Sequence, residues 1–125
     1  MNIPVHLKYA KSDEWFDPSS GKVGITDYAQ NQLSDIVFLE IVVIVGETLT
    51  AEKPIASVES VKAAGDVYLP VSGQIVALND DLLQKPETLN SDPYGAGWIV
   101  QLEGGDASGL MDAAAYEEYC ASRAH

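Results

Sequence analysis

Apolar residues along this chain occur in short runs separated by turns rich in Gly, Pro, Asp and Ser. The runs are dominated by Val, Ile and Leu, and branched side chains of this kind pack well on a pleated surface, so we interpret the runs as β-strands. Residues 12–16 are interpreted as a turn into the next strand. The predicted strands lie at 8–9, 23–25, 36–39, 55–58, 67–69 and 98–102.

Two of these runs carry further expectations. Residues 36–39 read Ile-Val-Phe-Leu, which predicts a buried strand, and the apolar residues 41–45 are expected to continue it or to pair beside it. Pro54 is expected at a strand start or an edge, because proline cannot donate a hydrogen bond to a β-ladder.

Helical patterns are few and short. Thr26 or Asp27 can cap a helix that ends near Leu33. Residues 79–89 have helical character, but an internal proline interrupts them, so two short turns are expected. A C-terminal helix is predicted over about 112–123, with Asp112 as its cap. Its predicted contact face holds Met111, Ala115, Tyr116 and Tyr119.

The stretch from about 55 to 70 predicts a β-hairpin around a lysine. The residues between its two apolar arms carry little bulk, and Gly65 is available for a turn position that needs a positive φ. Lys62 lies at the predicted tip and is the only Lys or Arg between Lys53 and Lys85. A tip on a rigid pair of strands is a suitable place to present a side chain to another protein.

A loose internal repeat concerns the same region. Residues 35–39 resemble 66–70, residues 47–49 resemble 81–83, and the Lys-Pro pair at 53–54 recurs at 85–86. We therefore expect a mainly β fold, a flattened barrel or sandwich built from two similar halves, with short helices and a C-terminal helix.

Length and charge limit the classes of function. A chain of 125 residues is expected to form one domain, residues 1–125. It has 19 acidic and 7 basic residues and a net charge of −12, which repels phosphate backbones and anionic lipid, so we expect neither a nucleic-acid nor a membrane partner. Such a surface favours basic patches on other proteins. No secretory signal or presequence is apparent, and a cytoplasmic monomer is expected.

Cysteine and histidine chemistry is sparse. Cys120 is the only cysteine, so an internal disulfide and a Cys-x-x-Cys redox pair are excluded, and we expect Cys120 to pack within the C-terminal helix. The two histidines, His6 and His125, stand near opposite ends of the chain, so no zinc site is expected.

Several stretches together resemble the glycine cleavage system H proteins. The resemblance extends from about Leu7 to the C-terminal helix. Its most specific parts are 24–30 (Gly-Ile-Thr-Asp-Tyr-Ala-Gln), 59–63 (Glu-Ser-Val-Lys-Ala), 66–68 (Asp-Val-Tyr), 70–73 (Pro-Val-Ser-Gly) and 92–98 (Asp-Pro-Tyr-Gly-Ala-Gly-Trp). The architecture that this resemblance implies is that of lipoyl and biotinyl domains.

The resemblance implies a covalent cofactor, lipoate, joined to Lys62 by an amide bond. The residues Glu59, Ser60, Val61 and Ala63 would form the recognition sequence around it. The chain would then be a carrier subunit in glycine catabolism and one-carbon metabolism, not an enzyme. It would take the aminomethyl group from glycine decarboxylase to a tetrahydrofolate-dependent aminomethyltransferase and electrons to dihydrolipoamide dehydrogenase. A lipoate ligase or lipoyl transferase would modify it.

The resemblance also implies a place where the loaded arm rests. Its matching residues are Ser12, Glu14 and Asp66, which we expect to lie on the hairpin side and to accept hydrogen bonds from the arm's amine. This sequence departs from the family at two nearby positions, because Asp13 and Gln32 stand where relatives have histidine.

Four alternative classes of protein differ in how well the sequence fits them. Biotin carrier domains have methionines beside their lysine, whereas Val61 and Ala63 flank Lys62. Lipoyl domains of 2-oxoacid dehydrogenases carry Asp before the lysine. A further role as a relay, which donates its lipoyl group to other 2-oxoacid dehydrogenase complexes, stays open. A stand-alone enzyme is the least expected, for want of a paired nucleophile and base.

Overall fold

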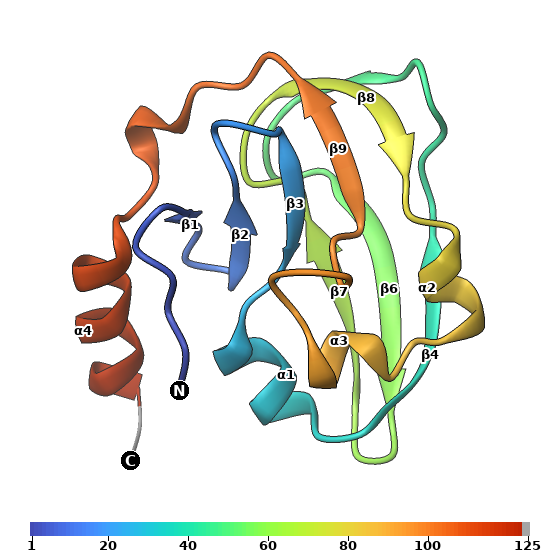
Figure 1. The fold of residues 1–125 in the computed structure, drawn as a ribbon, viewed down its shortest axis with the longest axis vertical. Helices are drawn as coiled ribbons and strands as arrows, with labels where there is room; N and C mark the ends of the chain where they lie inside the picture. Colours follow the sequence, from blue (N-terminus) through green and yellow to red (C-terminus); the bar gives the residue numbers. More distant parts are fainter. Residues whose placement is uncertain (124–125) are drawn as a thin grey trace.

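The computed structural model describes residues 1–123 and places their strands in two antiparallel β-sheets (Figure 1). The first sheet has the order β1-β2-β3-β9-β8-β5, and the second has the order β4-β6-β7. The strands of the first sheet are β1 (Lys8–Tyr9), β2 (Glu14–Phe16), β3 (Lys22–Ile25), β9 (Val100–Glu103), β8 (Gly73–Leu78) and β5 (Thr48–Leu49). Those of the second are β4 (Ile36–Ile41), β6 (Pro54–Ser60) and β7 (Ala64–Tyr68).

The main core lies between the two sheets. Branched side chains of the first sheet, such as Val23 and Ile75, pack in one cluster with Leu39, Val58 and Val67 of the second. Each such side chain contributes roughly 1.5–3 kcal/mol by leaving water. The predicted mainly β, flattened sandwich is thereby confirmed, with sheets that do not close into a barrel.

Short helices cover the edges of the sandwich. They are α1 (Asp27–Leu33), α2 (Asp81–Gln84), α3 (Thr88–Ser91), the 3₁₀ helix Ala107–Gly109 and α4 (Ala113–Arg123). Thr26 is the N-cap of α1, because its hydroxyl accepts the Ala29 N–H at 3.2 Å. Within residues 1–123, no helix is both long and apolar enough to cross a membrane.

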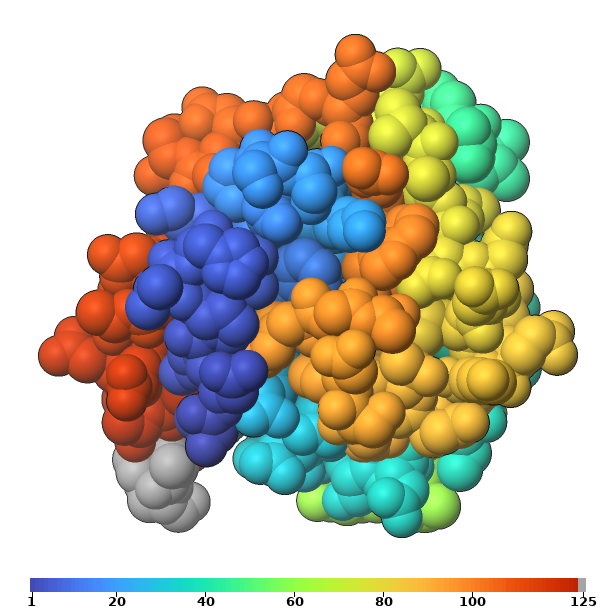
Figure 2. Space-filling model, viewed as in Figure 1, coloured from blue at the N-terminus to red at the C-terminus, as the bar shows by residue number. Residues whose placement is uncertain are grey.

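Helix α4 builds a second, smaller core against β1 (Figure 1). Tyr116 and Cys120 are buried there with Tyr9 and Trp15, so the packing role expected for Cys120 is confirmed. Ala115 is exposed, and its predicted place on the contact face is wrong, since the buried stripe follows the spacing from 116 to 120. In Figure 2 the N-terminal segment lies beside α4, and its Asn2 carbonyl accepts the Tyr94 hydroxyl at 2.7 Å.

Strand β4 departs from two expectations. Val37 and Phe38 are 55% and 48% exposed, so the prediction of a fully buried strand is wrong there. β4 is an outer strand, and its register shifts between Ile36 and Phe38, which turns this part of the strand toward solvent. The strand ends at Ile41, and residues 42–45 form no further strand, because the chain leaves β6 after the Val42 N–H donates to Ile55.

The internal repeat matches the strands and then diverges. Residues 36–39 of β4 and residues 66–68 of β7 lie on either side of β6. By contrast, residues 48–49 form β5, while their counterparts at 81–83 form α2. The last strand begins at Val100, later than the predicted Trp98, because the preceding loop extends through that tryptophan.

Candidate functional site

Lys62 is the middle residue of the three-residue loop, 61–63, at the tip of the β6–β7 hairpin. The strands pair from Pro54 opposite Tyr68 to Glu59 opposite Ala64, and the Ser60 N–H donates to the Ala63 carbonyl at 2.8 Å. Figure 1 shows this hairpin projecting beyond the helices at the lower end of the molecule. The arrangement presents the lysine on a rigid base.

The hydroxyl of Ser60 organises the tip. It accepts the N–H groups of Lys62 and Ala63 at 3.2 and 2.9 Å and lies 3.1 Å from the Ala63 carbonyl, to which it donates. A serine side chain thus replaces a backbone turn bond. Gly65 lies within β7 and is not among the residues with a positive φ, so the turn role predicted for it is wrong.

A chain of contacts supports the tip from the side. The Val61 N–H donates to the Asp35 carbonyl at 3.0 Å. The residues on either side of Asp35 are held by Asn90 of α3, which donates to the Ser34 carbonyl at 2.7 Å and accepts the Ile36 N–H at 2.9 Å. Asn90 lies 54 and 56 positions away from these partners, so no local pattern in the sequence could have indicated it.

Lys62 and its neighbours Glu59, Val61 and Ala63 are exposed, and Ser60 is half-buried. Among the described residues, no carboxylate forms an ion pair with Lys62. Its amine is therefore free to be reached by another protein. Val61 is 69% exposed, and together with Val37 and Phe38 it places apolar surface on β4 and the hairpin tip.

Glu14 of β2 is fully buried and joins the two sheets. One carboxylate oxygen accepts the Ser12 hydroxyl, and the other accepts the Tyr68 N–H on the free edge of β7 at 3.1 Å. Burial raises the pKa of the Glu14 carboxyl to about 7, although hydrogen bonds from Ser12 and Tyr68 act in the opposite direction. Sequence reasoning singled out Glu14 but missed its contact with Tyr68.

The other two predicted arm residues differ from Glu14 in their surroundings. Ser12 is exposed and lines a cavity of about 530 Å³, with Leu69 and Met111 among the other lining residues. Asp66 is exposed on β7, two residues before Tyr68. Ser12 thus contacts Glu14, and Glu14 contacts the end of β7 at Tyr68, whereas no hydrogen bond joins Asp66 to either of them among residues 1–123. Gln32 is exposed on α1.

The reach of a modified lysine can be compared with these positions. A lipoyl-lysine arm extends about 14 Å from its Cα atom. At roughly 3.3 Å per residue, Asp66 lies at most about 13 Å from Lys62, because residues 61–63 form a turn and shorten the path. An arm laid along β7 would therefore reach Asp66.

A comparison with protein families identifies the family of the chain that carries this hairpin. A family model described as "Glycine cleavage H-protein" matches residues 7–123. The chain belongs to the glycine cleavage H-protein family. This membership supports the carrier role in glycine cleavage that the resemblance of the motifs implies.

Relatives of this H-protein chain match over nearly their full lengths. A glycine cleavage system H protein of Deinococcus deserti is 51% identical over 118 residues, which cover 94% of this chain and 97% of the relative. That of Nitratidesulfovibrio vulgaris is 44% identical, with both chains covered completely. The crystal structure of a glycine cleavage system H protein from Mycobacterium marinum superposes with a TM-score of 0.84 at 35% identity, covering 98% of this chain and 100% of that one.

Proposed function

We propose that this chain is the lipoyl carrier of the glycine cleavage system and bears lipoate in amide linkage to Lys62. The observation that carries the proposal is an exposed lysine at a hairpin tip, with no carboxylate paired to it among residues 1–123, in a member of the H-protein family. When bound, the lipoyl group would supply a dithiolane that takes up an aminomethyl group and electrons.

The residues around Lys62 fit this cofactor. Ala63 and Ala64 carry so little bulk that the tip can enter the mouth of a partner's active site without collision. Ser60 holds the backbone of the loop through the N–H groups of Lys62 and Ala63, and the Lys62 side chain is exposed. Amide formation removes the charge of Lys62, and the acidic residues Glu59 and Asp66 then dominate the hairpin's charge.

The proposed partners are glycine decarboxylase, the aminomethyltransferase, dihydrolipoamide dehydrogenase and a lipoate ligase or lipoyl transferase. The chain itself acts as a carrier subunit rather than as an enzyme, and it raises the local concentration of a tethered group. We further propose that it forms one domain and works as a monomer in the cytoplasm. Sedimentation and cell fractionation test these last points.

The proposed resting place of the arm comprises Asp66, Ser12 and Glu14. Asp66 lies within reach along β7, and Glu14 lies beyond it with Ser12 hydrogen-bonded to its carboxylate. An ammonium group carried to Asp66 would meet an exposed carboxylate acceptor, and charge-assisted bonds of this kind are strong.

The test of the proposal is modification by a lipoate ligase followed by intact mass and peptide mapping. We expect one lipoyl group, on Lys62, and no modification of the Lys62→Arg variant. The variant should melt within a few degrees of the parent, because exposed substitutions change stability by about 0.5 kcal/mol or less. Lipoate on another lysine, or biotin on Lys62, would overturn the assignment.

A further inference from the structure

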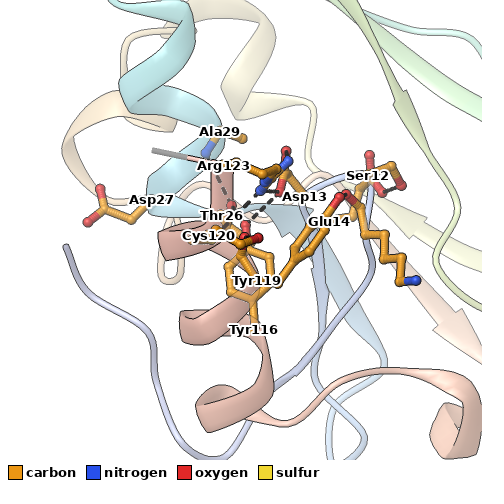
Figure 3. Close-up of polar contacts among 12 residues, drawn as sticks. Ser12, Asp13, Glu14, Thr26, Asp27, Ala29, Tyr116, Tyr119, Cys120 and Arg123 are labelled. Carbon is orange, nitrogen blue, oxygen red and sulfur yellow. Dashed lines mark hydrogen bonds and ion pairs between the residues drawn. The ribbon is translucent and has the colours of Figure 1, made fainter. Parts of the chain in front are cut away.

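We propose that helix α4 clamps the turn that carries Ser12 and Glu14, and that Arg123 is the principal positioning residue of this clamp. The proposal rests on the proposed function, since it assigns the clamp to the place where the arm rests. The clamp comprises Tyr116, Tyr119 and Arg123 of α4, which face Asp13 and the turn around it (Figure 3).

Asp13 is the residue of the turn to which Arg123 of α4 binds. Its Oδ1 atom accepts the Arg123 Nη2 group at 2.6 Å, and its Oδ2 atom accepts Nη1 at 3.2 Å. This bidentate contact between Arg123 and Asp13 is the one ion pair that the structure shows among residues 1–123. A planar guanidinium fixes both the distance and the orientation of a carboxylate, which a single lysine ammonium cannot do.

Arg123 is itself held in place by aromatic rings. Its guanidinium carbon lies 4.2 Å from the ring centre of Tyr28 in α1 and 4.1 Å from that of Tyr119 in α4. Cations above ring faces are attracted at these distances. The guanidinium therefore bonds Asp13 from a slot between two helices, and this slot limits its motion.

Two tyrosine hydroxyls of α4 also donate hydrogen bonds to the turn. The Tyr119 hydroxyl donates to the Lys11 carbonyl at 3.0 Å, and the Tyr116 hydroxyl donates to Asp13 at 2.8 Å. Because a carboxylate only accepts, the Thr26 hydroxyl, 2.7 Å from the Tyr116 oxygen, must donate to Tyr116. Thr26 also caps α1, so one chain of bonds joins α1, α4 and the turn.

The backbone conformation at Asp13 is unfavourable, and the contacts from α4 stabilise it. Asp13 has a φ of 75°, in the left-handed region that non-glycine residues rarely adopt. Its two chain neighbours are Ser12 and Glu14, which are hydrogen-bonded to each other, and Glu14 in turn accepts the Tyr68 N–H of β7. The contacts thus run without a gap from α4 through Asp13 and Glu14 to the strand that follows Lys62. They also assign a role to Asp13, whose function sequence reasoning left open.

The test uses substitutions that separate the grip from packing and backbone strain. Arg123→Met keeps a long side chain between the two rings but removes the bonds to Asp13. Arg123→Lys keeps the positive charge but lacks the guanidinium that bonds both oxygens of Asp13. Asp13→Gly deletes the carboxylate and adopts a positive φ without strain. Glu118→Met, on the exposed side of the same helix, is the matched control.

The first measurement is amide hydrogen exchange on the unmodified protein. Release of the turn should loosen the Glu14 contact, so the Tyr68 amide should exchange about tenfold faster in Arg123→Met and Asp13→Gly, and less so in Arg123→Lys. The amides of Val58 and Ile75 should keep their rates, as should Tyr68 in the Glu118→Met control. Unchanged Tyr68 exchange overturns the proposal, and so does an equal acceleration of all three amides, which would make Arg123 a contributor to global stability only.

The second measurement addresses the arm. Lipoylated protein charged with glycine by the decarboxylase is isolated, and its release of ammonia is timed well below the melting temperature. We expect release to be several-fold faster from Arg123→Met than from Glu118→Met, and equal rates overturn the positioning role. If the parent chain accepts no lipoyl group, the proposed function fails, while the exchange result at Tyr68 still decides whether the clamp exists.

Discussion

At the scale of single residues, Glu14 is a buried carboxyl that joins the two sheets. It is 1% exposed, and its two carboxylate oxygens serve Ser12 and the backbone of Tyr68. A buried carboxyl is costly when ionised, which raises its pKa from an ordinary 4.5 to about 7. Glu14 thus joins the two sheets, and the free energy of unfolding decreases as its carboxyl ionises.

This dependence gives a prediction for Glu14→Gln. The folded state holds the Glu14 proton to a higher pH than the unfolded chain, so the parent loses stability from this group as pH rises from 4.5 through about 7. Integrated over that range, the loss is about 3 kcal/mol. Glutamine does not titrate, so the parent's unfolding free energy relative to the variant should fall between about pH 5 and pH 8.

Urea denaturation of both proteins across that range measures the difference. The amide has only one oxygen for the two donors, which adds a destabilisation of the variant that does not vary with pH. A constant difference between parent and variant across the range would contradict the raised pKa.

At the scale of elements, glycine has opposite roles in β3 and β7. Gly24 pairs with Trp15 across the β2–β3 ladder, and a Cβ atom at Gly24 would lie 2.8 Å from the Trp15 indole. At Gly65 a Cβ atom would meet nothing within 4 Å. Gly24 is therefore required by its close packing against Trp15, whereas the space beside Gly65 would admit a larger side chain.

We accordingly expect Gly24→Ala to lower the unfolding free energy by roughly 1–3 kcal/mol, because the indole must shift in a packed core. Gly65→Ala should be neutral or stabilising by up to about 1 kcal/mol, since alanine has less conformational freedom than glycine in the unfolded chain. The midpoints of chemical denaturation compare the two variants. Equal losses in both would show that backbone freedom, not the Trp15 contact, governs the effect.

At the scale of the whole molecule, charge is distributed unevenly around the hairpin. The net charge is −12, and no Lys or Arg occurs between Lys22 and Lys53, the segment that contains β4. Lipoylation would remove the charge of Lys62 as well. The face beside the tip is thus acidic with exposed apolar residues, which suits a partner with a basic rim.

Association with such a partner should be sensitive to salt. With the lipoylated protein as substrate, kcat/KM of dihydrolipoamide dehydrogenase should fall about tenfold between roughly 0.02 and 0.3 M salt, as screening shortens the range of attraction. Free lipoamide is the control, and its kcat/KM should change little. Parallel salt curves for the two substrates would exclude electrostatic steering by this chain.

The sequence alone determined the features that depend on neighbours along the chain. The branched runs indicated most strands, Thr26 could be identified as a cap, and the motif around Lys62 pointed to the hairpin and the family. These patterns are local, because strand alternation, capping and turn chemistry involve residues a few positions apart. The assignment of lipoate to Lys62 and of the arm site stays a prediction.

The tertiary structure alone decided which distant residues meet. Only the stacking of the sheets shows that Val37 and Phe38 face solvent, because the same branched pattern serves an inner or an outer strand. Glu14 meets Tyr68 across 54 positions, and Arg123 meets Asp13 across 110. Such pairs leave no periodic trace in a single sequence, since their proximity follows from how complete elements pack against one another.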